Sequence, residues 1–433
     1  MPSRRGAVFA IVILFLINIL NFYDRNVAGA LVEPMRREFH LNDTQVGLLG
    51  TAFTVLYAII GVPLGRIADL WSRKRLLGAG MTIWGVLTAL AAVVTSFGGL
   101  MISRLGVGVG EATCAPAATS WIGDLVAPAK RAKALALFML GVPVGGALSY
   151  FFSGPIAQAY GWRTAMVIAA VPAFLLLPML FLLHEPHRGA SEGHTQPASP
   201  ASMWTVLKIP TLWWIIASGA LVNFNMYAIG TFMPALLGRI HGLKVGPAGI
   251  ATGTLYLIGG VAGGLAAGWI GDRIILTRRN GRLLACAIIM LVGSPFAYFG
   301  AIQPKGALIA AVALWTVSYG TLNSYYGLVY SSIHDIVAPA QRGATMALYF
   351  MAMYLCGASF GPLLTGRLSD MFAKRAAAGA PINDAARALG LQQAILIIPV
   401  LSVMLAFVLY MGSRTITGDI DKREAAAALA HTA

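Results

Sequence analysis

Charged side chains are scarce in this chain of 433 residues. They make up 11% of the sequence, whereas a soluble globular domain carries roughly 25%. Hydrophobic residues account for 58%. A soluble protein of this length needs a polar surface, and 31 basic with 16 acidic residues cannot provide one. The deficit argues against a soluble fold and predicts that lipid surrounds most of the molecule.

Cysteine is also rare, and its positions are informative. The three cysteines all fall inside apolar runs, and this location argues against a disulfide framework. The formal net charge is +15, but the basic residues form short clusters between apolar runs, which argues against binding of nucleic acid. No cluster of catalytic or metal-ligating residues is apparent, so the sequence predicts neither an enzyme nor a cofactor or metal site.

The apolar residues fall into twelve runs of about the length that a membrane helix needs, roughly 20 residues. We therefore predict an all-α polytopic membrane protein. The predicted spans are 8–31, 44–64, 77–96, 100–122, 134–156, 164–183, 212–237, 248–270, 283–302, 307–333, 344–364 and 391–411.

A polar stretch rich in proline, serine and glycine separates the sixth span from the seventh. It predicts an N-terminal bundle over 1–184, a cytoplasmic linker over 185–208, and a C-terminal bundle with a cytoplasmic tail over 209–433. A weak internal repeat supports duplication. Gly65-x-x-x-Asp69 ends the second span and Gly268-x-x-x-Asp272 ends the eighth, each before a basic cluster.

The distribution of basic residues predicts the orientation. With both termini in the cytoplasm, the cytoplasmic loops and ends hold 19 Lys and Arg, the other side holds 10, and two lie within spans. Cytoplasmic loops normally carry this excess. We therefore expect both termini inside the cell, and the short loops suggest a bacterial inner-membrane protein.

The first span carries an unusual set of polar residues. Asn18, Asn21 and Arg25 have i, i+3, i+7 spacing and share one helical face, and Asp24 lies beside that face. Ionisable groups within spans are costly and usually face the bundle interior. Asp24 is therefore a candidate proton-coupling group, while Asn21 and Arg25 are candidates for binding an anionic headgroup.

The fourth span repeats this pattern, with Arg104 and Glu111 on one face. Its two charges and those of the first span can cancel in pairs. A carboxylate whose arginine is drawn away is left unpaired in a low dielectric, and protonation relieves that cost. Glu111 is the principal proton-coupling candidate and Arg104 a headgroup candidate. A static ion-pair network that fixes helix packing is the alternative.

Polar and aromatic residues also cluster on two spans of the C-terminal bundle. They suggest a pocket with both apolar and hydrogen-bonding character, although packing or interfacial roles explain the aromatic residues about as well. The candidates are Asn223, Tyr227, Tyr319, Asn323 and Tyr326.

Residues 65–75 resemble the signature between the second and third helices of the major facilitator superfamily. The matching positions are Gly65, Ala68, Asp69, Arg73 and Lys74. Leu70 and Ser72 depart from the usual arginine and glycine. The resemblance extends to the fourth and fifth spans and implies two pseudo-symmetric six-helix bundles, alternating access and a monomer. Asp69 at a helix end can pair with Arg73 or Arg131 and latch the cytoplasmic side.

Two segments resemble the spinster branch of that superfamily more narrowly. They are Asn21-Phe-Tyr-Asp-Arg25 and the run from Arg104 to Glu111. The resemblance implies proton-linked transport of an amphipathic anionic lipid, such as a lysophospholipid or a sphingoid phosphate. The organic anion and proton symporters, which carry sugar acids and similar carboxylates, also begin with Asn-x-x-Asp-Arg and remain the alternative.

Two further motifs have simpler explanations. Gly357-Ala-Ser359-Phe-Gly361 matches a hydrolase nucleophile elbow, but it lies inside an apolar span rather than between a strand and a helix, which favours helix packing. Asn42-Asp43-Thr44 fits a glycosylation acceptor, and we interpret it instead as the cap of the second span.

Overall fold

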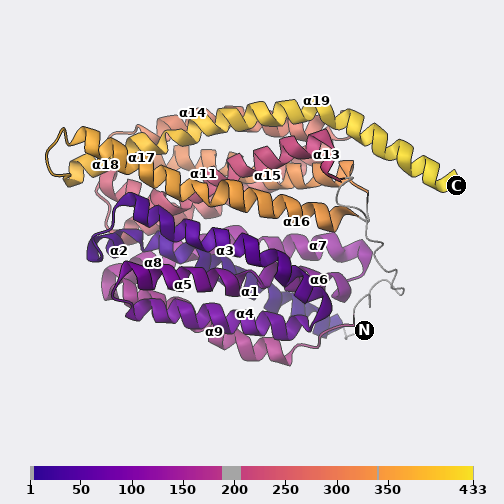
Figure 1. The fold of residues 1–433 in the computed structure, drawn as a ribbon, viewed down its shortest axis with the longest axis horizontal. Helices are drawn as coiled ribbons and strands as arrows, with labels where there is room; N and C mark the ends of the chain where they lie inside the picture. The colour runs from indigo at the N-terminus through magenta and orange to yellow at the C-terminus, as the bar shows by residue number, and fades with distance from the viewer. Residues whose placement is uncertain (1–3, 188–205, 339–340, 433) are drawn as a thin grey trace.

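The computed structural model describes residues 4–187, 206–338 and 341–432, and every regular element in these ranges is a helix (Figure 1). The first half of the chain, 4–187, forms α1 (Arg4–Ala30), α2 (Val32–Glu38), α3 (Asp43–Leu70), α4 (Arg73–Leu90), η1 (Ala91–Val93), α5 (Phe97–Glu111), α6 (Cys114–Leu125), α7 (Pro128–Met139), α8 (Gly141–Tyr160) and α9 (Trp162–Leu182). The second half, 206–432, forms α11 (Pro210–His241), α12 (Val245–Thr254), η2 (Leu255–Gly259), α13 (Gly260–Ile274), α14 (Gly281–Ala301), α15 (Leu308–Ile336), α16 (Arg342–Met353), η4 (Tyr354–Ala358), α17 (Phe360–Ala376), α18 (Asp384–Ile395) and α19 (Ile397–Thr432).

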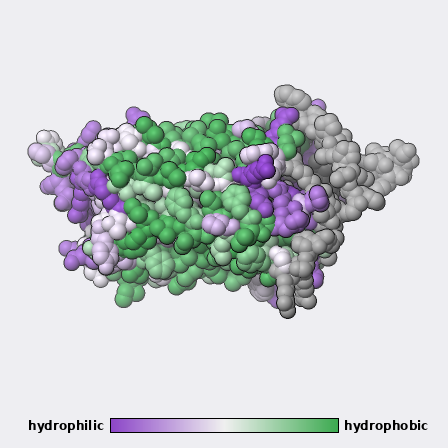
Figure 2. Space-filling view, turned by 90° about the horizontal axis from the view of Figure 1, so that it is seen from below, coloured by the Kyte–Doolittle hydropathy of each residue, from purple (hydrophilic) through white to green (hydrophobic). Residues whose placement is uncertain are grey.

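Ten helical stretches in the described part of the chain are long and apolar enough to cross a membrane. The remaining two of the predicted twelve spans are the α5–α6 pair, which is interrupted, and α15, whose polar residues lower its hydropathy. Figure 2 shows one face of the molecule, with apolar residues across its middle and hydrophilic residues toward both ends. The prediction of an all-α polytopic membrane protein is confirmed.

Several helices extend beyond the predicted apolar spans. α3 begins at Asp43 with a capping box in which Asn42 accepts from the amide of Gln45, so the capping interpretation of this motif is confirmed. It continues to Leu70, past the predicted end of the span at 64. Residues predicted as a tail after 411 continue α19 to Thr432. Hydropathy detects only the part of a helix that lies in lipid, whereas backbone hydrogen bonding continues into the aqueous layers.

Five predicted spans are interrupted, which corrects the expectation of continuous helices. The fourth breaks at Ala112 and Thr113, and the fifth breaks at Leu140, just before its glycine and proline segment. The twelfth breaks at Leu396, between the end of α18 and the start of α19. The eighth and eleventh contain the π-helical turns η2 and η4. A π turn inserts an extra residue into the helical ladder and redirects the side chains that follow it.

The two halves pack against each other along two pairs of helices, α3 with α17 and α8 with α12. Both chain termini lie at the same end of the molecule (Figure 1), and we call this end the termini side and the other the opposite side. One buried apolar cluster spans both halves and takes its first-half members from the opposite side, as Val27, Leu31 and Leu49 illustrate. First-half residues toward the termini side, such as Ile13 and Trp84, form a separate cluster. The halves are thus joined mainly at the opposite side.

The predicted linker lies largely outside the described residues, which end at 187 and resume at 206. Its first residue, Glu185, is described and is bound to the start of α4. The Glu185 carboxylate accepts from the Ser72 hydroxyl at 2.6 Å and from the amide of Arg73 at 2.8 Å. Burial alone would raise the pKa of Glu185, but these donors and the Arg73 side chain hold it below its usual value. The start of this stretch is therefore part of the first bundle.

Candidate substrate and coupling site

A buried ion pair joins the first and fourth spans. Arg25 Nε lies 3.3 Å from Glu111 Oε2, and the two side chains are 4% and 0% exposed. Asn21 bridges them, because its Oδ1 accepts from Arg25 Nη2 at 3.2 Å and its Nδ2 donates to the main-chain oxygen of Glu111 at 3.4 Å. Asn21 and Arg25 are four residues apart on α1, so both point at the same stretch of α5.

Arg25 also reaches the second half of the chain. Its Nη1 donates to the hydroxyl of Tyr354 at 3.2 Å and to that of Tyr227 at 3.5 Å. Aromatic rings flank the guanidinium, with centroids 4.4 Å away for Tyr57 and 4.5 Å for Phe22. The acceptors in these hydrogen bonds are uncharged phenols and the distances are long, so an anionic oxygen would bind the same donors more strongly. The environment therefore suits exchange of a tyrosine for an anionic ligand.

Three buried charged groups, Glu111 of this pair and two beside it, retain polar atoms without hydrogen-bond partners. Both carboxylate oxygens of Asp24, Oε1 of Glu111 and Nε of Arg104 are buried and unbonded. Asp24 is fully buried and Arg104 is 6% exposed. Buried polar atoms are almost always satisfied in folded proteins, and exceptions concentrate at functional sites. The expected cancellation in pairs is realised for Arg25 with Glu111, whereas no hydrogen bond or ion pair is described for Asp24.

The second-half candidates divide into separate groups. Tyr227 contacts the Arg25 guanidinium. Asn223 accepts a hydrogen bond from the Tyr326 hydroxyl at 3.3 Å. The Asn323 side chain donates to the first carbonyl of α13 at 2.6 Å, and the Tyr319 ring packs 4.4 Å from an aromatic ring of η2. The structure therefore places Tyr227 beside the charged site and connects Asn323 and Tyr319 to the interrupted eighth span.

Tyr354 and Tyr57 both contact Arg25 but were not among the residues predicted from the sequence. Tyr354 opens the π turn η4, where the amide and hydroxyl of Ser359 both donate to its carbonyl oxygen, at 3.0 and 2.9 Å. Thr54 of α3 donates to the Ser359 hydroxyl at 3.0 Å, so the turn is held from the other half. Ser359 is thus part of a helix contact, in agreement with the packing interpretation. Tyrosine inside an apolar span was the signal available, but helical periodicity cannot predict a π turn.

The predicted gate residues lie at the termini side. Arg73 is buried and forms ion pairs with Asp124 and, at 3.2 Å, with Glu185, both in the first half. Lys74 donates to the main-chain oxygen of Phe181 at 3.2 Å. These contacts attach the start of α4 to α6 and to the end of α9.

The other three gate candidates are less fully defined. The side chain of Asp69 lies outside the described residues. Gly65 lies on the last turns of α3, where nothing approaches within 4 Å of the position of a side chain. Arg131 lies near the start of α7. The gate therefore stays a prediction. Among the described residues, no group of His, Cys, Asp and Glu side chains is arranged to hold a metal ion.

Comparison with known proteins agrees with this architecture. A family profile of the Major Facilitator Superfamily matches residues 14–362. An MFS-type efflux pump of Mycolicibacterium smegmatis is 30% identical over 382 residues, which cover 85% of each chain. Protein spinster homolog 1 of Xenopus laevis is 28% identical over 392 residues, which cover 86% of this chain and 74% of the relative.

A solved structure is also similar along almost its whole length. It is a bacterial homologue of the human lysosomal transporter Spinster, in an inward-facing and occupied conformation. Its TM-score is 0.85 at 26% identity, and the match covers 96% of this chain and 99% of that one.

The fold and the buried charges thus define a multi-pass membrane transporter rather than an enzyme. The chain belongs to the major facilitator superfamily, and spinster proteins are among its homologues. Both resemblances drawn from the sequence motifs are confirmed.

Proposed function

We propose that this protein is a proton-coupled transporter of an amphipathic anion, such as a lysophospholipid or a sphingoid phosphate, and that it works by alternating access. The observation that supports this most directly is the environment of Arg25. This buried cation is bound at once to a carboxylate of the first half and to two tyrosines of the second half. An anion that binds there contacts both halves and changes the pairing of a buried carboxylate.

The proposed coupling follows from charge balance. When the anionic headgroup of the substrate takes the donors of Arg25, Glu111 loses its partner in a low-dielectric site. An unpaired buried carboxylate is costly, and protonation removes the cost. Asp24, which already lies buried without a hydrogen-bond partner, is the second site for a proton. Proton and substrate occupancy then become linked through one conformational equilibrium.

The surroundings of Arg25 favour a lipid-like substrate over a sugar acid. Aromatic rings from both halves lie around the guanidinium, including Phe22, Phe53, Tyr57 and Tyr354. Such a wall suits an acyl chain or sphingoid base, whereas a polyhydroxylated carboxylate would leave its hydroxyls without partners. The name of the mycobacterial relative is compatible with export of such a molecule.

We further propose that the protein lies in the cell inner membrane as a monomer, with the termini side in the cytoplasm. The excess of basic residues on that side supports this orientation. Because the halves are joined mainly at the opposite side, the structure then corresponds to an inward-facing state. Cysteine labelling that placed residues 185–208 outside the cell would refute this topology.

The substrate class is tested by transport into proteoliposomes that contain the purified protein. Lysophospholipid and sphingoid phosphate are compared with a sugar acid. We expect only the two lipids to be moved, and expect Arg25→Ala to abolish transport while Arg25→Lys retains part of it. Transport of the sugar acid alone would favour the organic anion alternative.

Proton coupling is tested with Glu111→Gln in the same vesicles under an imposed pH gradient. The variant keeps the size and hydrogen-bonding capacity of the side chain but cannot bind a proton. We expect it to fold, bind substrate and lose accumulation driven by the gradient. If this variant accumulates substrate as the wild type does, the charges of the fourth span serve helix packing and not proton coupling. Arg104→Ala is expected to be more damaging, because it leaves Arg25 as the one buried cation described beside the two carboxylates Asp24 and Glu111.

A further inference from the structure

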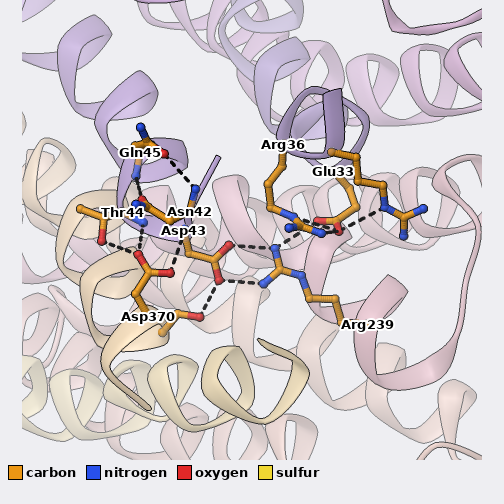
Figure 3. Close-up of polar contacts among 10 residues, drawn as sticks. Glu33, Arg36, Asn42, Asp43, Thr44, Gln45, Arg239 and Asp370 are labelled. Carbon is orange, nitrogen blue, oxygen red and sulfur yellow. Dashed lines mark hydrogen bonds and ion pairs between the residues drawn. The ribbon is translucent and has the colours of Figure 1, made fainter. Parts of the chain in front are cut away.

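At the opposite side, the second half of the chain caps the first amides of α3. Asp370 of α17 accepts from the amides of Asp43 and Thr44 at 3.0 and 2.8 Å and from the Thr44 hydroxyl at 2.6 Å (Figure 3). Asn42 and its own capping box serve the next amide, that of Gln45. The early amides of a helix need acceptors from outside the helix. Here two of them depend on a residue more than 300 positions away.

The start of α12 is capped across the interface in the same way. Gln158 Oε1 of α8, in the first half, accepts from the amide of Gly246 at 3.0 Å. The next residue, Pro247, has no N–H to satisfy. The start of α12 is therefore capped by one hydrogen bond to a neutral acceptor, whereas the start of α3 is capped by three hydrogen bonds to a carboxylate.

The two caps occupy equivalent places in the internal repeat. Asp43 and Gly246, whose amides are capped, are 203 positions apart, which is also the separation of the repeated Gly-x-x-x-Asp segments that end the second and eighth spans. The acceptors also correspond, because Gln158 and Asp370 each lie four residues after a glycine at the helix crossing.

Those glycines permit the close approach. A methyl group at Gly154 would lie 2.8 Å from the carbonyl oxygen of Val245, and one at Gly366 would overlap that of Asp43. The same arrangement, a glycine followed four residues later by a polar acceptor, thus occurs twice. The acceptor is charged in one copy, Asp370, and neutral in the other, Gln158.

Among the described residues, only the charged copy is reinforced by an ion-pair bridge. Arg239 of α11 binds both oxygens of Asp43, at 2.7 and 2.8 Å, and its Nη2 lies 3.1 Å from Glu33 (Figure 3). Ser369 donates to Asp43 at 2.6 Å. Burial alone would raise the pKa of Glu33, but Arg239 and Arg36 hold it below its usual value, so this carboxylate stays ionised at neutral pH. Arg239 and Asp43 are themselves buried.

We propose that two symmetry-related helix caps close the opposite side of this transporter, and that the charged one is the principal lock. Separation of the halves there removes the acceptor from two amides of α3 and leaves Asp43 without its arginine. It removes only one neutral hydrogen bond from α12. Since hydrogen bonds to charged groups are the stronger kind, the α3 cap sets most of the cost of opening.

The test measures the distance across the opposite side by electron spin resonance. Labels are placed at Thr95 and Gly306, an exposed residue and a loop glycine with open space around it, in a chain whose three native cysteines are replaced by alanine. We expect Asp370→Asn to raise the ratio of open to closed molecules roughly tenfold or more, and Gln158→Ala to raise it by a smaller factor. Arg239→Gln should resemble Asp370→Asn.

Asp384→Asn is the matched control, because Asp384 is an exposed aspartate at the same side for which no hydrogen bond to the first half is described. It should leave the distances unchanged. If Asp370→Asn fails to fold, Thr44→Ala removes one of the three bonds and should shift the distances in the same direction by less. Unchanged distances in the cap variants, or equal effects of Gln158→Ala and Asp370→Asn, would overturn the proposal. None of these outcomes depends on the substrate or on proton coupling.

Discussion

The two sides of the molecule use ion pairs differently. At the opposite side, Arg239 of the second half binds Asp43 and Glu33 of the first. At the termini side, the ion pairs between described residues stay within one half. Arg73 binds Asp124 and Glu185, for instance, and Arg282 binds Asp335 at 2.6 Å.

This contrast separates two tasks that buried charges perform in a transporter. Pairs within a half fix helices to one another, so that the half can move as a rigid body. Pairs between halves stabilise one conformation and must break when the molecule alternates. A change to the first kind should therefore alter stability, and a change to the second should alter the population of states.

The largest effect is expected where the halves touch most closely. Gly366→Leu places a side chain where even a methyl group would overlap Asp43, so the opposite side should fail to close and transport should be abolished. Label distances between positions 95 and 306, together with transport in proteoliposomes, check this. Gly418→Leu should be tolerated, because no atom outside the local helix backbone lies within 4 Å of the side-chain position at this helical glycine. A closed distance in Gly366→Leu would show that the helices can separate without opening the side.

Removal of a buried pair within one half should act on stability instead. Arg73→Ala leaves Asp124 and Glu185, whose side chains are 18% and 21% exposed, without their shared cation. Loss of a hydrogen bond to a charged group costs about 1.5 to 3 kcal/mol. We expect a clear fall in the melting temperature in detergent, with little change in label distances at either side among the molecules that remain folded. A shift in distances without loss of stability would mean that Arg73 is part of the gate.

A smaller effect is expected from Asp69→Asn. If Asp69 latches the termini side in the other conformation, loss of its charge should favour the inward-facing state, by a few-fold in population. Labels at the exposed Arg75 and Arg278 report on this side. Distances identical to those of the parent protein would argue against the latch.

The smallest effect is expected from an exposed pair on the termini side. Arg279 contacts Asp421 at 2.7 Å, and both side chains are more than half exposed. Such pairs contribute at most about 1 kcal/mol. Arg279→Ala should therefore leave the melting temperature and the label distances nearly unchanged. A strong effect would assign the extended end of α19 a role in holding α14.

Much of the charged site could be predicted from local sequence. Helical spacing on the first span placed Asn21 and Arg25 on one face, and the pair that Arg25 makes with Glu111 follows once the two spans are neighbours. The contributions of Tyr354 and Tyr57 could not be predicted, because a π turn and contacts between halves set their positions.

The caps that the two halves provide for each other at the opposite side could not be predicted from the sequence either. Asn42 was interpretable as a cap because it lies three residues from the amide it binds. Asp370 caps the same helix from 327 positions away, and nothing in the residues around Asp370 marks it as a capping residue. The repeated Gly-x-x-x-polar arrangement can be recognised as a capping arrangement only when the helix crossings are known.

The sequence by itself determined that lipid is the solvent, that the chain crosses the membrane twelve times, and that several ionisable groups lie within the spans. Hydropathy and helical periodicity are local properties, so both can be detected within a segment of about 20 residues. Tertiary structure alone decided which charges pair, which helices are capped by the other half, and which side is closed. Those outcomes depend on contacts between residues from 51 to 327 positions apart. The contacts between the halves, such as that of Arg239 with Asp43, exist only in the conformation that brings the halves together.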